Sequence, residues 1–497
     1  MANATVETPG DPNSIVYPDR PNLPPDSFDN LSDRPNILYF QLDNLGFGEI
    51  GTYGGGILRG TSTPRIDSFA EQGIKLLNFA PESQCTPSRS AIMTGRYATR
   101  SGTHTVALPG LGGGIAAWEK TMGDVLSEAG YNNYIVGKWH IGEEKGRLPT
   151  DHGFLHWYGV PRSYDEALYF EDPFYNPEDI QRGDPVSHVV ASDLGGDLQE
   201  YEVLDLDVKR NLDVEYMERA KQWMQESKEA GKPFFMYFNH TLMHMPIVPR
   251  DEFKGKTGYG DNADCLYEMD HDFGEMLDYL DELGVTDNTI VVFAGENGPE
   301  EIEEYRGNPG FFEGSYFAGS EGNLRTPAIV RYPGKVEEGR ESDEIVHITD
   351  MFTTLIRWAG AEIPQDRVID GEDQRAFFED KTDELESARE GFPIWNGRDL
   401  YGAKWHHYKL KFYDQKYMFD PALRFPTPNL INLKVDPKER IPNDPRYYWV
   451  SKHVFSILGN YALSTQVEPE IPWLSGVGCT PDKVKEGSEE CLPQLPY

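Results

Sequence analysis

The sequence is poor in three features that would each have pointed to a different class of protein. Only four of its 497 residues are cysteines, which is too few for a small domain built on a disulfide framework. No apolar run approaches the roughly 20 residues that a membrane-spanning helix needs, so no membrane partner is expected. With 46 Lys and Arg against 83 Asp and Glu, the net charge is -37. A chain this acidic lacks the basic footprint that nucleic acid requires.

The rest of the composition is that of a large globular protein. Hydrophobic residues make up 38% and aromatic residues 12% of the chain, and this length exceeds what one core usually serves, which predicts a large domain and a smaller one. The acidic residues are spread along the chain, as expected for a well-solvated surface. An anionic substrate must therefore meet a local positive pocket. The composition is compatible with a monomer or an oligomer.

The N-terminal 30 residues are rich in proline and lack the apolar core of a signal peptide, so we expect an extended arm on the surface. This predicts a cytoplasmic location, or a periplasmic or secreted one if the sequence is a mature form. Cys479 and Cys491 flank a short polar loop and form either one disulfide or two free thiols. Cys265 lies beside the apolar stripe of an expected helix and should be an inert, buried thiol.

Short apolar runs alternate with amphipathic segments from about residue 35 to the 370s, which predicts an α/β domain with a large, mostly parallel sheet flanked by helices. A charged, helix-favouring stretch at 372–389 marks the boundary. We expect the α/β domain to span 31–385, and a small α+β subdomain with an antiparallel sheet to span 386–497. The strands expected in the large sheet are 36–41, 134–136, 234–238, 289–293 and 328–331. The expected helices are 64–72, 121–129, 213–228, 263–282 and 351–358, with 450–461 in the subdomain.

Polar residues follow four of these strands directly. In an open α/β sheet ligands bind beyond the carboxyl ends of the strands, so these groups should converge in one crevice. Taken singly, each pair is ordinary turn chemistry, and a lone histidine is more often structural. The four pairs are Asp43 and Asn44, Lys138 and His140, His240 and His244, and Glu296 and Asn297.

Asp43, Asn44, Glu296 and Asn297 offer only oxygen ligands. Hard divalent cations prefer oxygen, whereas zinc prefers the nitrogen and sulfur of His and Cys. The set therefore predicts a Ca²⁺ site, with Mg²⁺ as the alternative.

The segment Gln84-Cys85-Thr86-Pro87-Ser88-Arg89 continues to Thr94-Gly95-Arg96. Pro87 suits the first turn of a helix, which would place Cys85 at a helix N-terminus where backbone N–H groups attract an anion. Arg89 would add a positive charge one turn later. Without further information, Cys85 could be a reactive thiol with a lowered pKa at this position.

At residues 85–96 the sequence resembles the sulfatase family, whose signature Cys-x-Pro-Ser-Arg continues toward Thr-Gly-Arg. Further similar segments are Gly137-Lys138-Trp139-His140-Ile141-Gly142 and Glu321-Gly322-Asn323-Leu324-Arg325-Thr326-Pro327. The resemblance runs from about Arg34 to the late 430s. It implies an alkaline phosphatase-like fold and a sulfuric ester hydrolase.

The resemblance also implies that a maturation enzyme, a formylglycine-generating enzyme, oxidises Cys85 to formylglycine. The hydrated aldehyde, a gem-diol bound to the metal together with the four oxygen ligands, would attack sulfur and expel the alcohol. In the family pattern, Arg89 would polarise the nucleophile and Lys138 would bind the sulfate oxygens by their positive charge. His140 would act as the base, and His244 would protonate the leaving oxygen. His240 is the alternative to His244, and Ser163 matches a substrate-binding position.

Two departures from the family stand out. The family usually has Asp-Asp where this chain has Asp43-Asn44, and Asp-Asn where it has Glu296-Asn297. A lysine that many sulfatases place shortly before the Glu-Gly motif is missing, and Tyr316 is the candidate for its space. The metal shell thus carries less negative charge than the family pattern.

The expected substrate is a small-molecule sulfate ester of an aryl or other small alcohol, with the alcohol half contacting loops such as 107–117 and 162–172. A phosphonate monoester or phosphodiester hydrolase of the same superfamily is the nearest alternative, because it too displaces a group at a tetrahedral anion. A non-catalytic binder of sulfated glycans is the alternative from another class.

Overall fold

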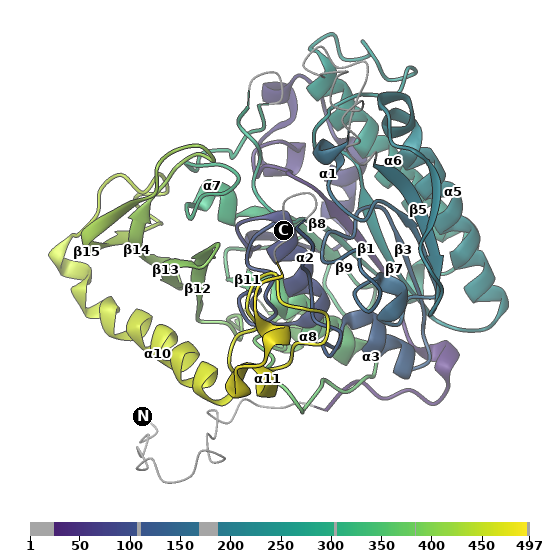
Figure 1. Ribbon diagram of the computed structural model, residues 1–497. Helices are drawn as coiled ribbons and strands as arrows, with labels where there is room; N and C mark the ends of the chain where they lie inside the picture. The colour runs from purple at the N-terminus through teal and green to yellow at the C-terminus, as the bar shows by residue number, and fades with distance from the viewer. Residues whose placement is uncertain (1–23, 107–110, 168–186, 303–305, 383, 495–497) are drawn as a thin grey trace, which may run out of the picture.

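The computed structural model describes residues 24–106, 111–167, 187–302, 306–382 and 384–494. Most of the expected N-terminal arm lies outside these residues, and so do parts of the two loops expected to meet the alcohol. Within the described residues the chain forms a large mixed sheet between two layers of helices and a second, smaller sheet (Figure 1).

The large sheet has eleven strands in the order β10-β2-β9-β8-β1-β7-β3-β4-β5-β6, with β11 paired to β2. Its centre is parallel, since β1 pairs in parallel with β7 and β8, and β7 with β3. The strand expected at 328–331 instead runs antiparallel to β8. The strands are β1 (Asn36–Leu42), β2 (Ile74–Ala80), β3 (Asn132–Val136), β4 (His156–Gly159), β5 (His188–Asp193), β6 (Gln199–Val203), β7 (Phe234–His240), β8 (Thr289–Gly295), β9 (Thr326–Arg331), β10 (Arg340–Ser342) and β11 (Val346–His347).

Helices cover both faces of this sheet because its central strands are apolar on both sides. Along β1, Leu38 and Phe40 face the core beneath α1, α5 and α6, while Ile37 and Tyr39 face the core beneath α2, α3 and α8. All five helices expected in this domain are present. The helices are α1 (Pro64–Ala70), α2 (Cys85–Thr94), α3 (Met122–Glu128), α5 (Leu206–Glu229), α6 (Asp261–Leu283), α7 (Glu321–Leu324), α8 (Ile348–Trp358) and α9 (Arg375–Glu379).

The second sheet is antiparallel, as expected, in the order β12-β13-β14-β15. Helix α10 packs on β12 and β13, which confirms the helix expected from residue 450 and extends it to Val467. The separate folding of 386–497 stays a prediction. The elements are β12 (Gly391–Asn396), β13 (Asp399–Trp405), β14 (Tyr408–Asp414), β15 (Leu423–Asn432), α10 (Ser451–Val467) and α11 (Pro481–Glu486).

The charged stretch at 372–389 is helical only over the short α9. The Asp380 carboxylate accepts hydrogen bonds from the backbone N–H groups of Thr382 and Glu384, at 2.9 and 2.8 Å. Side-chain bonds of this kind compete with helical ones and stop the helix. Most of this stretch therefore stays outside regular helix, although its residues favour one.

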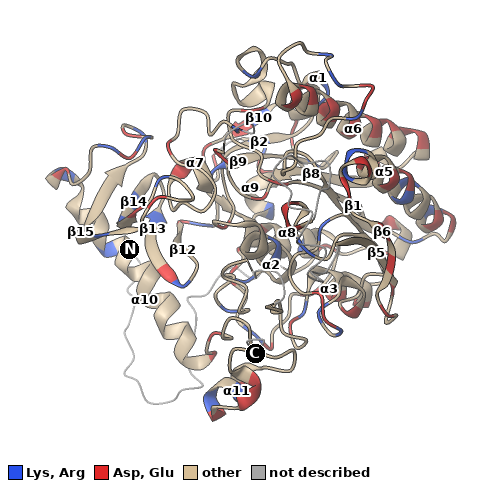
Figure 2. Ribbon diagram, turned by 45° about the horizontal axis from the view of Figure 1, so that its top comes forward, with Lys and Arg blue, Asp and Glu red and all other residues tan. Residues whose placement is uncertain are grey.

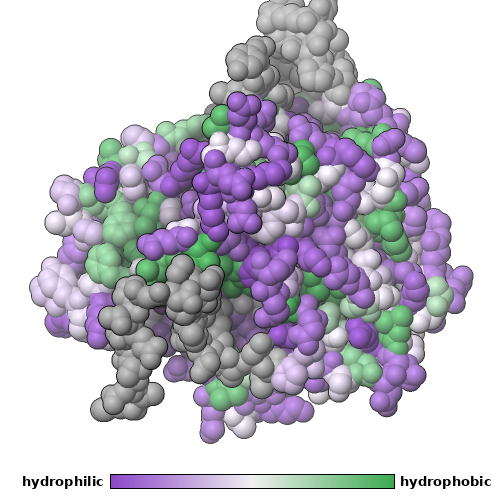
Figure 3. All heavy atoms as spheres, turned by 60° about the horizontal axis from the view of Figure 1, so that its bottom comes forward, coloured by the Kyte–Doolittle hydropathy of each residue, from purple (hydrophilic) through white to green (hydrophobic). Residues whose placement is uncertain are grey.

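The molecular surface agrees with the composition. Asp and Glu are prominent on the outer helices α5 and α6 (Figure 2). Hydrophobic residues gather on the left in Figure 3, the side where Figure 1 places the second sheet and α10. Within the described part of the chain, no helix is long and apolar enough to cross a membrane. Cys479 and Cys491 form a disulfide, and Cys265 is a fully buried free thiol.

Candidate active site

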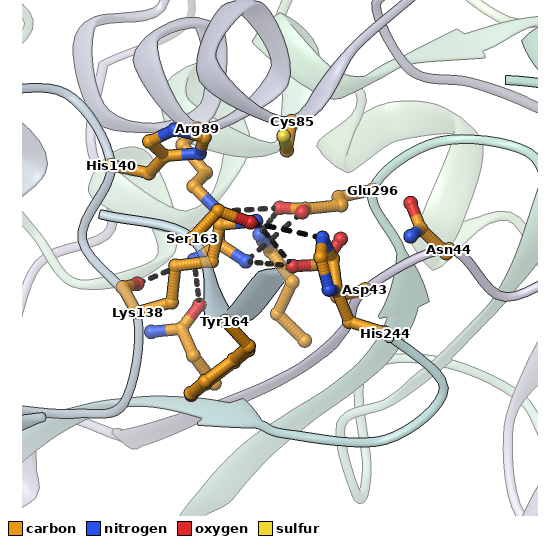
Figure 4. A network of polar contacts seen from close by, with 12 residues as sticks. Asp43, Asn44, Cys85, Arg89, Lys138, His140, Ser163, Tyr164, His244 and Glu296 are labelled. Atoms are coloured by element: carbon orange, nitrogen blue, oxygen red, sulfur yellow. Dashed lines mark hydrogen bonds and ion pairs between the residues drawn. The ribbon is translucent and has the colours of Figure 1, made fainter. Parts of the chain in front are cut away.

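The four strand ends that carry polar residues belong to neighbouring strands. In the sheet order β8, β1, β7 and β3 lie side by side and parallel, so their carboxyl ends open at one edge. The backbone keeps the following loops together, since Glu296 N donates to Leu42 O at 3.0 Å and Met243 N donates to Asp43 O at 3.1 Å. The structure brings together Asp43, Asn44, Lys138, His140, His244 and Glu296 of the expected set (Figure 4).

Cys85 is the first residue of α2, and Gln84 is its N-cap. The thiol is 1% exposed, and its Sγ lies 3.2 Å from the Tyr316 hydroxyl oxygen. Burial raises the pKa of the Cys85 thiol to about 12, although Lys138 opposes the shift. The unmodified residue is thus a protonated thiol at neutral pH. This argues against a reactive low-pKa cysteine, because the thiolate is the nucleophile.

Arg89, one helical turn after Cys85, binds the two buried carboxylates of the site. Its Nη2 lies 3.2 Å from Asp43 Oδ2 and 3.0 Å from Glu296 Oε1. Its Nη1 donates to Asn239 Oδ1 at 2.9 Å. Because Arg89 is itself only 1% exposed, it is a fixed charge that holds the loops after β1 and β8 on α2.

A chain of polar contacts runs from Asp43 to His244 (Figure 4). Lys138 Nζ lies 2.8 Å from Asp43 Oδ2 and donates to Ser163 Oγ at 3.1 Å. Ser163 Oγ is in turn 3.0 Å from His244 Nε2. Burial alone would raise the pKa of Asp43, but Lys138, His244 and Arg89 bring it well below its ordinary value. Asp43 is therefore an anion in this site.

His244 Nδ1 lies 2.8 Å from the Met245 carbonyl oxygen. A carbonyl only accepts, so the proton of the neutral ring sits on Nδ1 and Nε2 faces Ser163. Burial and Lys138 lower the pKa of His244, while Asp43 and Asp165 oppose them. An anion bound beside the ring would add to that opposition and favour the protonated form.

His140 follows β3 with φ of 61°. It is 7% exposed, and neither ring nitrogen has a hydrogen-bond partner among the described residues. Thr86 Oγ1 fixes the backbone here by donating to the His140 carbonyl oxygen at 2.8 Å. Burial, with Lys138 and Arg89, holds the pKa of His140 well below its ordinary value. The ring is therefore neutral and has a lone pair to accept a proton.

The oxygen ligands fit a hard cation. Asp43, Asn44, Glu296 and Asn297 are each at most 2% exposed. Asp43 Oδ1 and Asn297 Oδ1 are buried without a hydrogen-bond partner among the described residues. Burial and Asp43 together raise the pKa of Glu296 well above its ordinary value, although Arg89 opposes them. Two adjacent buried carboxyl groups with unpaired oxygens nearby are the environment that a divalent cation stabilises.

His240 lies apart from this group. Its Nε2 is 3.1 Å from Asp272 Oδ2, and its Nδ1 is 3.6 Å from Asp213 Oδ2. Burial alone would lower the pKa of His240, but these two carboxylates raise it. The contacts favour a structural role for His240 and leave His244 as the histidine beside Lys138 and Ser163.

Sequence reasoning missed Glu300. This carboxyl is 8% exposed and interacts with Asn44, Asp43 and Lys138. Burial, with Asp165 and Asp43, raises the pKa of Glu300 to about 8. Its signal was an acidic residue three positions after Asn297 in a loop that already carried two candidate ligands.

Comparison with known proteins agrees with this geometry. The Sulfatase family model matches residues 35–361, which is more than half of the chain. The chain belongs to the sulfatase family. Canine N-acetylgalactosamine-6-sulfatase (Canis lupus familiaris) is 32% identical over 356 residues, which cover 68% of this chain and 65% of that protein. The chain thus matches just under two thirds of that relative's length.

Two further sulfatases match over more of their length. Human steryl-sulfatase (Homo sapiens) is 27% identical over 534 residues, covering 89% of this chain and 90% of that protein. The crystal structure of the PsFucS1 sulfatase from Pseudoalteromonas sp. superposes with a TM-score of 0.83 at 27% identity, covering 88% of this chain and 91% of that chain. The sulfatase fold expected from the signature is confirmed.

Proposed function

We propose that this sulfatase hydrolyses sulfate esters, with Cys85 as the precursor of formylglycine and with Ca²⁺ or Mg²⁺ as its metal. The observation that carries the proposal is the environment of Cys85. A buried, protonated thiol at the start of α2, close to Lys138, Asp43 and Glu296, is a poor nucleophile as it stands. The same surroundings suit an oxygen nucleophile held next to a cation.

Formylglycine, when hydrated, supplies a hydroxyl that attacks sulfur and a second hydroxyl whose loss of a proton releases sulfate, and the cation supplies Lewis acidity. Asp43, Asn44, Glu296 and Asn297 would hold the cation. The chain must therefore bind the sulfate, protonate the leaving oxygen and accept a proton.

Lys138 and Ser163 are placed to bind the sulfate oxygens, because Nζ and Oγ lie 3.1 Å apart at the centre of the site. His244 donates a proton from Nε2 to the leaving oxygen, and Asp165 Oδ1, 3.7 Å from Nε2, supports its charged form. His140, neutral and without a partner among the described residues, accepts a proton beside residue 85.

Mass spectrometry of the peptide that contains Cys85 tests the modification. Conversion replaces the sulfur and two hydrogens of the side chain by one oxygen, so the peptide becomes lighter by that difference. Preparations made with and without a formylglycine-generating enzyme should differ in this mass and in sulfate release from 4-nitrophenyl sulfate. Cys85→Ala should release no sulfate, whereas Cys265→Ala is the matched control and should keep its rate. Full activity of Cys85→Ala would overturn the proposal.

The phosphonate and phosphodiester hydrolase reading is tested with the same preparation. Tyr316, which lies beside Cys85, is our candidate for the space of the lysine that many sulfatases have. We expect kcat/KM for 4-nitrophenyl sulfate to exceed that for 4-nitrophenyl phenylphosphonate. The reverse order would favour the alternative, and a folded protein without either activity would favour a binder of sulfated glycans.

A further inference from the structure

A cleft adjoins the site on the side of α2 and His140. Thr86 and His140, the neighbours of Cys85 in this region, line it together with Arg162 and, from the C-terminal segment, Trp473. A substrate whose sulfate lies at residue 85 can therefore extend into this cleft. The roles proposed above leave Trp473 and the far part of the cleft without a function.

Glycines keep part of the cleft wall free of side chains. Gly112, Gly113 and Gly114 line it and have φ of 66°, 96° and 128°. A Cβ at Gly114 would lie 2.3 Å from the Ile141 carbonyl oxygen, so no larger residue fits there. This part of the wall consequently offers backbone groups, and no side chains, to a ligand.

Trp473 is held in place from both sides although it lies far from the site in sequence. Ile471 N donates to the Arg100 carbonyl oxygen at 3.0 Å, and Ala117 N donates to the Val477 carbonyl oxygen at 2.9 Å. The Cys479–Cys491 disulfide closes the loop that follows. The half-buried Trp473 ring is thus a fixed aromatic face at the cleft.

His104 stands beside this ring, and Arg398 stands beside His104. The His104 ring centroid is 6.4 Å from that of Trp473, and Arg398 Nε donates to His104 Nε2 at 3.2 Å. Burial, with Arg398, lowers the pKa of His104 to about 4, so the ring is a neutral acceptor. Arg398 is exposed and makes no ion pair with a carboxylate of the described residues. In a chain with net charge -37, such an arginine is available for an anion on a ligand.

The lining favours a sugar over a sterol or a simple aryl group. Apolar ligands are usually enclosed by apolar and aromatic side chains. Here Trp473 is the one Trp, Tyr or Phe among the described lining residues, and it is accompanied by Thr86, Thr103, Thr105 and Glu143. One aromatic face with several hydrogen-bonding groups suits a ring that is apolar on its face and hydroxylated at its edge.

We propose that this cleft binds the saccharide part of a sulfated oligosaccharide, with Trp473 stacked on a sugar ring and Arg398 paired with a second anionic group of the same ligand. The proposal rests on the proposed sulfatase function and narrows it to carbohydrate substrates. The anionic group is a uronate carboxylate or a further sulfate, and both are met by the same guanidinium chemistry.

The test compares substrates of increasing size on the matured enzyme. The probes are 4-nitrophenyl sulfate, N-acetylgalactosamine 6-sulfate, an uronate-containing chondroitin 6-sulfate disaccharide, and disulfated disaccharides prepared from carrageenan and fucoidan. We expect Trp473→Ala to raise KM for the disaccharides about tenfold more than for 4-nitrophenyl sulfate. Trp473→Phe should restore most of the loss. Phe419→Ala is the control, because Phe419 is an exposed aromatic residue (80%) outside the cleft lining. It should leave KM unchanged for the disaccharides and for 4-nitrophenyl sulfate.

Arg398→Gln separates the two anions. This substitution should raise KM only for the disaccharides that carry a second anionic group. Comparing the uronate and disulfate probes shows which anion Arg398 binds. If no disaccharide is hydrolysed while 4-nitrophenyl sulfate is, the carbohydrate proposal is wrong and the sulfatase function stands. Equal effects of Trp473→Ala on all substrates would also refute it. Failure on every sulfate ester would instead refute the proposed function itself.

Discussion

The hydroxyl oxygen of Tyr316 lies 3.2 Å from Sγ of Cys85. Burial and the neighbouring Cys85 raise the pKa of Tyr316 well above its ordinary value, so the phenol stays neutral and can donate a hydrogen bond to an oxygen at residue 85. Tyr316→Phe removes this donor and keeps the ring. We expect kcat for 4-nitrophenyl sulfate to fall about tenfold or more while the mass of the Cys85 peptide still shows conversion. An unchanged kcat would mean that the hydroxyl only fills space.

Lys138 is the cation that we propose binds the sulfate. Lys138→Met removes the charge and keeps much of the side-chain volume, and we expect kcat/KM for 4-nitrophenyl sulfate to fall about 10²- to 10³-fold. Lys221→Met, which removes an ion pair with Glu275 on the helical surface, serves as the control and should keep its rate. Thermal melting of both variants separates a lost contact from a lost fold. A smaller loss for Lys138→Met than for Lys221→Met would contradict this role.

Removing the metal should leave protons in the site. Burial raises the pKa values of Glu296 and Glu300, the latter to about 8, so without a cation both carboxyl groups tend to be protonated at about pH 7. Adding Ca²⁺ to protein treated with a chelator should raise the melting temperature and release protons. Calorimetry in two buffers of different ionisation enthalpy counts these protons. Glu300→Gln should release fewer, and identical binding enthalpies in the two buffers would contradict the expectation.

Glu82 predicts a pH dependence of stability. Burial raises the pKa of Glu82 from 4.5 to about 8, so the folded state holds a proton that the unfolded state loses. This contribution is fully present below about pH 4.5 and is lost as the pH rises through about 8. Between pH 5 and 8 the loss of this contribution lowers the free energy of unfolding by ~3 kcal/mol. Urea unfolding of Glu82→Gln should show a smaller fall in stability over this window than the wild type, and exposed Glu71→Gln should show the same fall. A steeper fall for Glu82→Gln would reverse the sign and refute the argument.

Glu321 joins α7 to the second sheet. Its carboxylate lies 2.7 Å from Lys404 Nζ, 3.1 Å from Lys409 Nζ and 2.6 Å from Arg325 Nε. Glu321→Gln leaves Lys404, Lys409 and Arg325 buried with one fewer negative charge to balance them. We therefore expect the free energy of unfolding to fall by about 3–5 kcal/mol. Lys404→Met in the same background should recover part of it, since burial already lowers the pKa of Lys404 to about 7. Additive effects of the two substitutions would show that the pair is not coupled.

Much of the fold follows from patterns within short stretches of the sequence. Buried β-type runs such as residues 36–41 and amphipathic stretches such as 263–282 form a strand and a helix because each has apolar residues at the spacing of one element. Only the structure gives the antiparallel direction of β9, because strand direction depends on which strands it meets. The stretch at 372–389, where we expect the domain boundary, is helical only over α9, because the Asp380 carboxylate accepts hydrogen bonds from the backbone that follows.

The sequence alone gathered Cys85, Arg89, Lys138, His140 and His244 into one predicted site, because local motifs resemble those of sulfatases and the strand ends share one sheet edge. Only the tertiary structure decided which groups meet. It placed His240 against Asp272, brought Tyr316 to Cys85 and Glu300 to Asp43 and Asn44, and set Trp473 at the cleft. The physical reason is that burial and charge depend on neighbours distant in the sequence, and these neighbours fix the pKa of each group and the space left for a substrate.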